Sequence, residues 1–267
     1  MKNLLLIFIV SIFTVGCSSD GLIDDSKSEE PFTYKNGTLS TGKISSSGLN
    51  APNGFEFSEI PAGSEGMLLA YHLNWNDAAQ STISDDFTIS PNESWKIENL
   101  SIFIMNPDIM PSSINSVKTL VLEIYDGDPK LSNSKKVYGN MNDNVFKSIS
   151  PTNIYRVTNL TTSDSMNEQA KLVYKVDSSI KDLNLPSGHY WFKMTFKFDY
   201  GDDWFWFAPR LPVTGNDVNA FNAYFRLEST GDIFTTDQGS SSPQNPVQPP
   251  SVKFETHFEI TGIKTIN

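Results

Sequence analysis

The feature that most constrains the fold is the strict alternation in residues 189–199, HYWFKMTFKFD. Successive side chains of a β-strand point to opposite faces, so a strand with one buried face carries an apolar residue at every second position. This segment has that pattern over its whole length. It predicts a long strand with the following side chains turned inward: Tyr190, Phe192, Met194, Phe196 and Phe198.

Similar alternation recurs along the chain, and no window of comparable length has an apolar stripe of helical period. The other predicted strands cover residues 66–75, 86–89, 95–105, 117–125, 154–157, 171–176, 221–228 and 252–261. Turn-forming residues separate them, as in Ser90-Pro91-Asn92. We therefore expect an all-β fold of two facing antiparallel sheets, a β-sandwich of jelly-roll or immunoglobulin-like topology. A parallel α/β fold is excluded because the crossover helices are missing.

The first residues indicate export. Met1-Lys2-Asn3 is a short basic start, and the apolar run LLLIFIVSIF that follows it is too short for a permanent bilayer span. The run ends in Thr14-Val15-Gly16-Cys17, which resembles the lipobox of bacterial lipoproteins. The resemblance implies that residues 1–16 are removed and that Cys17, the single cysteine of the chain, is acylated. The alternative is an ordinary secretory signal followed by an incidental cysteine.

Composition divides the rest of the chain. Residues 17–50 are rich in Ser, Gly and acids and predict a disordered tether behind the lipidated cysteine. Residues 51–234 make the sandwich, and residues 235–251 form a Pro- and Ser-rich linker or loop. Because one strand cannot fold alone, we expect residues 252–267 to return a last strand to the sandwich. The early acids of the tether resemble the export signal of surface lipoproteins of the Bacteroidota, which implies an outer-membrane anchor and exposure on the cell surface.

A second resemblance lies in the order of short segments. DDFTI (85–89), SWKI (94–97), VLEIYDGDP (121–129), IYRV (154–157) and LPSGHYWF (185–192) precede an aromatic segment that ends in APR. This order is similar to that of a β-sandwich domain in secreted proteins of the Bacteroidota, over about residues 66–228 of this chain. The family has no established activity, so the resemblance implies a fold and a location but no catalytic residue. It also implies structural roles for residues in the recurring segments: Trp95, Tyr155, Arg156, Tyr190 and Trp191.

Charge and residue spacing exclude several classes of function. The net charge of −11 becomes −12 after removal of residues 1–16, which takes away Lys2 and no acid. This charge repels nucleic acid, and no cluster of Lys and Arg offsets it. The three histidines are far apart in the sequence, and no serine lies in a G-x-S-x-G motif. We therefore expect a protein that is not an enzyme.

Paired carboxylates are the remaining route to catalysis, because a glycosidase needs two at a defined separation. All the candidate pairs lie beside turns, where Asp bonds the local backbone, and adjacent acids on a strand point to opposite faces. The pairs are Asp85-Asp86, Asp126 with Asp128, and Asp202-Asp203. A structural calcium ion held by Asp126, Asp128 or Asp202 is an alternative role. No other cofactor is expected.

The segment DDWFWFAPR, residues 202–210, concentrates four large aromatic residues. In a strand, Trp204 and Trp206 share one face and the phenylalanines share the other, so one core cannot take all four. One interpretation places the tryptophans beneath a loop. The other makes them an aromatic shelf for sugar rings, together with Trp191 and with hydrogen bonds from Asp202, Asp203 and Arg210.

Two functions from different classes follow. The first is a lipid-anchored surface protein that binds a glycan or another extracellular ligand through the aromatic shelf. The second is a structural or accessory subunit of an outer-membrane complex, whose aromatic patch contacts a protein. Both have the lipid bilayer as a partner through acylated Cys17. In addition, Asp164-Ser165-Met166 resembles the short O-glycosylation motif of the Bacteroidota, which implies a sugar on Ser165.

Overall fold

The computed structural model describes residues 28–60, 72–73, 80–105, 117–158, 161–164, 170–198, 205–207, 209–210, 221–234 and 254–266. At residues 72–73, 198, 205–207 and 209–210 it describes the backbone alone. The described part is all-β, as the alternation predicted, and its strands form two large sheets and one short two-stranded ribbon.

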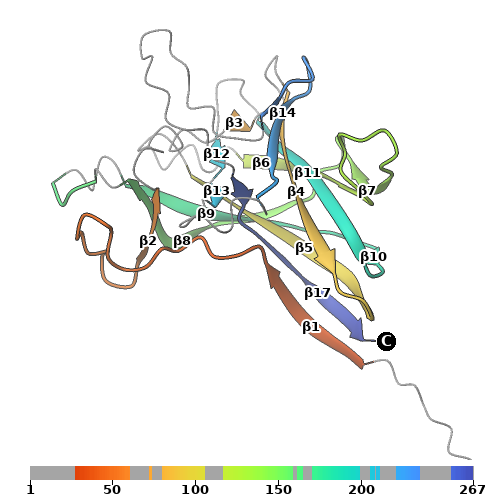
Figure 1. Cartoon of the computed structure of the whole chain (residues 1–267), viewed down its shortest axis with the longest axis horizontal. Helices are drawn as coiled ribbons and strands as arrows, with labels where there is room; N and C mark the ends of the chain where they lie inside the picture. The colour runs from red at the N-terminus through yellow and green to blue at the C-terminus, as the bar shows by residue number, and fades with distance from the viewer. Residues whose placement is uncertain are drawn as a thin grey trace, which may run out of the picture.

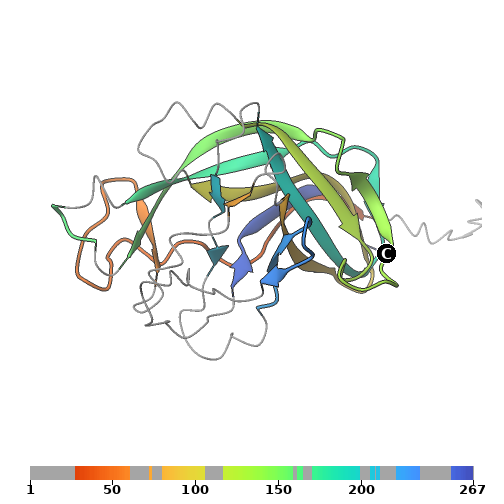
Figure 2. The ribbon, with the colours of Figure 1, turned by 90° about the horizontal axis from the view of Figure 1, so that it is seen from above.

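The larger sheet has nine strands and is strongly curled into a half-barrel (Figures 1 and 2). Its main path runs β1-β17-β5-β9-β8-β2, and β10, β12 and β3 join at its sides. The sheet is mixed, because β2 and β8 pair in parallel while its other pairs are antiparallel. The bounds are β1 (Ser28–Lys35), β2 (Glu56–Ile60), β3 (His72–Leu73), β5 (Glu93–Met105), β8 (Phe146–Thr158), β9 (Lys171–Ser178), β10 (Leu183–Leu185), β12 (Phe205–Phe207) and β17 (Phe258–Ile266).

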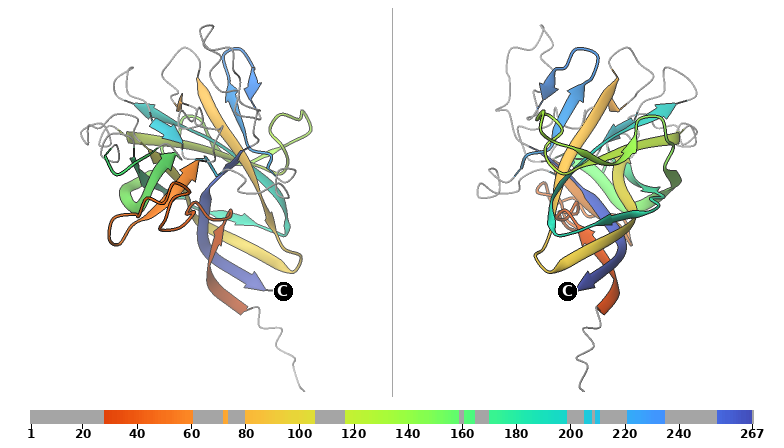
Figure 3. Two further views of the ribbon diagram at one scale, coloured as in Figure 1. Left: turned by 60° about the vertical axis from the view of Figure 1, so that its left-hand side comes forward. Right: turned by 90° about the vertical axis from the view of Figure 1, so that its right-hand side faces the viewer.

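The second sheet has six strands in the order β15-β14-β4-β11-β6-β7 and is antiparallel throughout (Figure 3). The bounds are β4 (Ser81–Ile89), β6 (Val117–Tyr125), β7 (Lys136–Asn140), β11 (Gly188–Phe198), β14 (Tyr224–Leu227) and β15 (Ile233–Phe234). The short ribbon pairs β13 (Pro209–Arg210) with β16 (Glu255–Thr256), directly before β17.

One hydrophobic core fills the space between the two large sheets. The alternating side chains of β11 enter it as predicted, and Tyr190, Phe192, Met194 and Phe196 are all buried. The ring of Phe192 meets that of Phe258 on β17 edge-on, with centroids 4.9 Å apart, so side chains from both sheets interlock. Burial of this apolar area is the main force that holds the sheets together.

The second half of β5 is buried on both faces. Leu100, Ile102, Ile104 and Met105 belong to the main core, whereas Phe103 packs with Leu39 and Val173 in a second cluster. A strand covered on both sides needs apolar residues at nearly every position, which explains the run IFIM. β5 also pairs with β17, which has a bulge between Thr261 and Gly262. An added Cβ at Gly262 would overlap the Lys96 carbonyl oxygen, so glycine permits this close approach of β17 to β5.

The N-terminal segment differs from the predicted tether. Residues 28–35 form β1, which pairs along its whole length with β17, from Ser28 opposite Ile266 to Lys35 opposite Glu259 (Figure 1). Phe32 and Tyr34 lie against the core side chain of Trp95. The sequence did not predict this strand, because β1 lies at the edge of the sheet and buries few side chains. The predicted signal, residues 1–16, and the whole predicted linker, residues 235–251, lie outside the described residues.

Candidate functional site on the outer face of the six-stranded sheet

The face of the six-stranded sheet that points away from the core carries charged and aromatic groups that meet across strands. The register places Trp191 of β11 between Asp86 of β4 and Tyr125 of β6, and Lys193 between Ser84 and Glu123. We call this surface the outer face. The side chains at its centre, in its aromatic part and at one exposed corner differ in pairing and in exposure to solvent.

The centre of the outer face is a closed network of ion pairs. The Glu123 carboxylate accepts a hydrogen bond from Lys136 Nζ at 2.8 Å and another from the Tyr125 hydroxyl at 2.7 Å. It also lies 3.0 Å from Lys193 Nζ. Burial raises the pKa of Glu123, but the bonds from Lys136 and Tyr125 and the charge of Lys193 outweigh burial and leave that pKa below its usual value. Each charge has a partner, so the centre links β6, β7 and β11.

The aromatic part of the outer face is covered. The rings of Trp191 and Tyr224 lie 5.7 Å apart, and Lys130 from the β6–β7 loop places Nζ 4.0 Å above the Tyr224 centroid and 5.6 Å from that of Trp191. This is cation–π geometry. As a result Trp191 is only 5% exposed. Its assignment to an open aromatic shelf is therefore corrected: alternation placed its face rightly, but a loop lysine covers the ring.

One corner of the outer face is open, and we call Asp86, His189 and Asn222 the Asp86 corner. Asp86 Oδ2 lies 2.8 Å from His189 Nε2 and accepts from Asn222 Nδ2 at 2.5 Å. The His189 side chain is 53% exposed and Asn222 is exposed. Within the described residues, no group donates a hydrogen bond to the other carboxylate oxygen of Asp86, Oδ1. The Asp86 carboxylate is thus held in place through Oδ2, and its side chain is 21% exposed.

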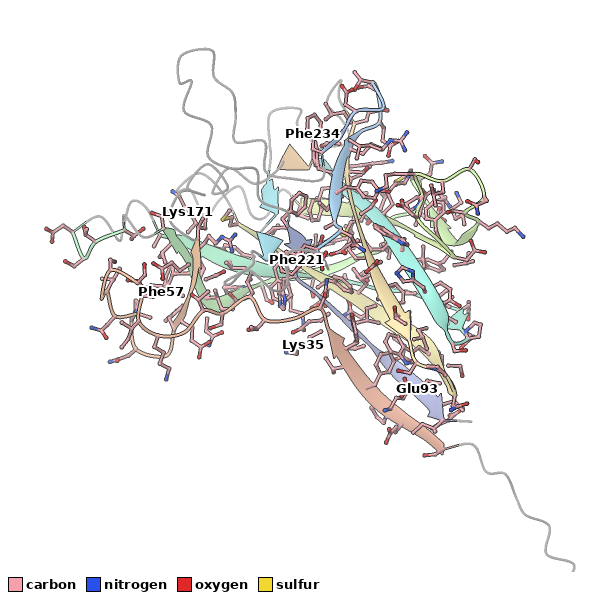
Figure 4. All side chains as sticks on the ribbon, in the orientation of Figure 1. Lys35, Phe57, Glu93, Lys171, Phe221 and Phe234 are labelled. Carbon is pink, nitrogen blue, oxygen red and sulfur yellow. The ribbon has the colours of Figure 1, made fainter. Side chains whose placement is uncertain are left out.

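A second acidic group lies beneath this corner. Asp85, the neighbour of Asp86, points to the opposite face as expected and is fully buried. It accepts from the Thr256 amide at 2.7 Å and from the Asp86 amide at 2.8 Å. Glu255 accepts hydrogen bonds from the backbone amides of residues 222 and 223 at 3.0 and 3.2 Å, so the segment that contains Asn222 is tied to β16. Figure 4 labels the neighbouring residue Phe221.

Asp85 and Glu255 share this buried site as an acid pair. Burial, together with the charge of Glu255, holds the pKa of Asp85 well above its usual value, and burial also raises the pKa of Glu255. A proton retained on the pair removes the repulsion between the two carboxyls. The pair lies where Asp85 connects β4 to β16, and both acids are buried.

Asp126 and Asp128, the suggested calcium ligands, accept hydrogen bonds from the backbone of the β6–β7 loop. Asp126 Oδ1 accepts from the Lys135 amide at 2.6 Å, and Asp128 Oδ1 accepts from the Lys130 amide at 2.9 Å. Asp128 also pairs with Lys130 Nζ at 3.1 Å, which fixes the lysine that covers the aromatic rings. Within the described part of the chain, no three His, Cys, Asp or Glu side chains are grouped to hold a metal ion.

The aromatic segment is described only in part. The backbone of Trp206 lies opposite His72 of β3 and Met105 of β5, and that of Arg210 lies opposite Glu255. The remaining predicted site residues lie outside the described residues: Cys17, Ser165, Asp202, Asp203 and Trp204. Over the ranges that are described, no helix is long and apolar enough to cross a membrane.

The sequence interpretation missed the Asp86 corner. Asp86 was considered only as half of an adjacent doublet, and His189 only as a polar position on its strand. The antiparallel register of β4 and β11 brings them together across 103 residues of sequence, and Asn222 lies 136 residues from Asp86. No local motif contains such a pairing. Comparisons of the chain with protein-family models, curated proteins and solved structures found no match.

Proposed function

We propose that the chain is a lipid-anchored protein of the bacterial outer surface that binds a glycan at the Asp86 corner. The lipobox at Cys17 and the acidic residues that follow it support the location, and the order of β-sandwich segments supports a secreted domain of jelly-roll or immunoglobulin-like type. The shared core of two sheets is compatible with that class of fold.

The arrangement of Asp86 carries the proposal. Sugar hydroxyls are both donors and acceptors, so their sites need fixed groups of both kinds. His189 and Asn222 hold one carboxylate oxygen, which leaves the other to accept from a hydroxyl, and the Asn222 amide and the His189 ring add polar atoms at the same exposed corner.

We infer binding rather than turnover from the position of the neighbouring acids. A glycosidase places two accessible carboxyls on either side of the scissile bond. Next to Asp86, however, the carboxyls of Asp85 and Glu255 are buried, with 0% and 6% of each residue exposed. Asp86 therefore suits the role of a ligand that accepts hydrogen bonds.

The alternative, an accessory subunit with a protein partner, predicts a broad apolar surface. Among the described residues, the exposed large hydrophobic side chains lie in four stretches of the sequence: Ile44, Leu131 with Val137, Ile233, and Ile266. This distribution favours the glycan proposal.

A glycan array tests it. The probe is the soluble protein from Ser18 to the C-terminus, so that β1 is retained, and it is compared with Asp86→Ala and Asn222→Ala. The control is Glu98→Ala, which removes an exposed carboxylate from β5 in the other sheet. We expect the wild type and Glu98→Ala to bind the same glycans and the two corner variants to lose at least tenfold in affinity. Equal binding by all four proteins would refute the site, and failure of the wild type to bind any glycan would refute the function.

A further inference from the structure

Arg156 of β8 is a buried cation, and none of the described residues supplies its counter-ion. It is 1% exposed, and it lies between two neighbouring strands, directly opposite Ser58 of β2 and Lys171 of β9. Figure 4 labels Phe57 and Lys171 on these flanking strands. Its Nη1 donates to the Ser58 hydroxyl at 2.7 Å. No carboxylate among the described residues forms an ion pair with it.

The two other nitrogens of its side chain are the important ones. Nε and Nη2 are both buried, and within the described part of the chain neither has a hydrogen-bond partner. These atoms form one edge of the planar guanidinium, where their N–H bonds run parallel. That edge matches two oxygens of a carboxylate, sulfate or phosphate group, which it binds through two hydrogen bonds.

Because Arg156 is buried, it is energetically costly to leave Nε and Nη2, which we call the guanidinium fork, without hydrogen-bond acceptors. A buried charge is tolerated when it is paired and hydrogen-bonded. Here burial lowers the pKa of Arg156 to about 9, so the guanidinium still keeps its proton at neutral pH. Lys171, directly opposite on β9, is a second positively charged residue and supplies no anion. Charge balance at this point of the sheet therefore calls for an anion.

We infer that Arg156 is the centre of a buried site for a small oxyanion, which binds through two oxygens to Nε and Nη2. The ligand class is a free acetate-like carboxylate or a free sulfate or phosphate ion, because two parallel N–H donors match two oxygens of such a group. The bound anion joins β2, β8 and β9 at the place where the parallel pair enters the nine-stranded sheet. This site is separate from the Asp86 corner and does not depend on glycan binding.

Thermal unfolding in acetate, sulfate and chloride at equal ionic strength tests the site. The soluble protein from Ser18 onward is compared with Arg156→Met, which keeps the side-chain bulk and removes the fork, and with Arg156→Lys, which keeps the charge. Lys43→Met is the control, because it removes an exposed cation of the same chain. A bound anion raises Tm with the logarithm of its concentration, whereas general salt effects act on all four proteins alike.

We expect acetate or sulfate to raise the Tm of the wild type and of Lys43→Met by several degrees more than chloride does. This excess should vanish in Arg156→Met and shrink in Arg156→Lys. A selenate peak beside Nε and Nη2 in the anomalous map of a soaked crystal would support the same site directly. If Arg156→Met does not fold, Arg156→Lys decides the question. An excess that is equal in the wild type and the Arg156 variants, or no excess in the wild type, would overturn the inference.

Discussion

Truncation of the aromatic side chains of β1 should destabilise the whole domain. The Phe32 ring lies 4.5 Å from that of Trp95, and the Tyr34 ring lies 5.5 Å from Trp95 and 5.9 Å from Phe258. Trp95 and Phe258 belong to the main core. If residues 28–35 were a tether, neither ring would contribute to the free energy of unfolding.

The magnitude follows from burial. Replacing a fully buried phenylalanine by alanine costs about 3–5 kcal/mol. Phe32 and Tyr34 are about half-buried, so we expect each alanine variant to lower the free energy of unfolding by about 2 kcal/mol. For a domain of this size, such a loss lowers Tm by about 4–8 °C. The double variant should lose somewhat less than the sum, because both rings contact Trp95.

Urea unfolding followed by tryptophan fluorescence measures these differences on the soluble protein from Ser18 onward. Thr33→Val is the matched control, since Thr33 lies between the two rings on the exposed face of β1 and valine keeps a β-branched side chain. Its free energy of unfolding should stay within about 0.5 kcal/mol of the wild type. If Phe32→Ala and Tyr34→Ala also stay within that margin, β1 does not belong to the folded unit.

Three further results are expected. Because the pKa of Asp85 is raised above its usual value of 3.8, the stability that its protonated form contributes is complete below that pH and is lost as pH rises through the folded-state pKa. Urea unfolding against pH should show this fall, and Asp85→Asn should flatten it. Cys17→Ser should release the protein from the membrane fraction, and protein that stays bound after a carbonate wash would contradict lipidation. Thermal melts of Trp204→Ala and Trp206→Ala distinguish the two interpretations of the aromatic segment: an exposed shelf predicts a change below about 0.5 kcal/mol, and buried rings predict a loss of about 3–5 kcal/mol.

Local alternation predicted the strands that bury a whole face. β11 illustrates this, because its inward positions are aromatic or aliphatic without exception. β1 was assigned to a tether because an edge strand that turns only Phe32 and Tyr34 toward the core has the composition of a loop. The parallel pairing of β2 with β8 was also missed, since register between distant segments leaves no periodic signal in either of them.

The candidate site was less predictable than the fold. Alternation placed Trp191 on the outer face, but it contains no information on the loop that brings Lys130 over the ring. The Asp86 corner depends on three segments that meet only after both β4–β11 and β4–β14 have paired. The buried fork of Arg156 was equally hidden, because its short segment IYRV reads as an ordinary strand.

The most direct test of the proposed function is an NMR titration of the isotopically labelled soluble protein with a glycan that the array identifies. We predict that the shift changes centre on the amide and ring signals of His189 and the side-chain amide of Asn222, and that Asp86→Ala removes them. Saturable binding that shifts other signals, while those of His189 and Asn222 stay unchanged, would contradict the placement of the site at the Asp86 corner.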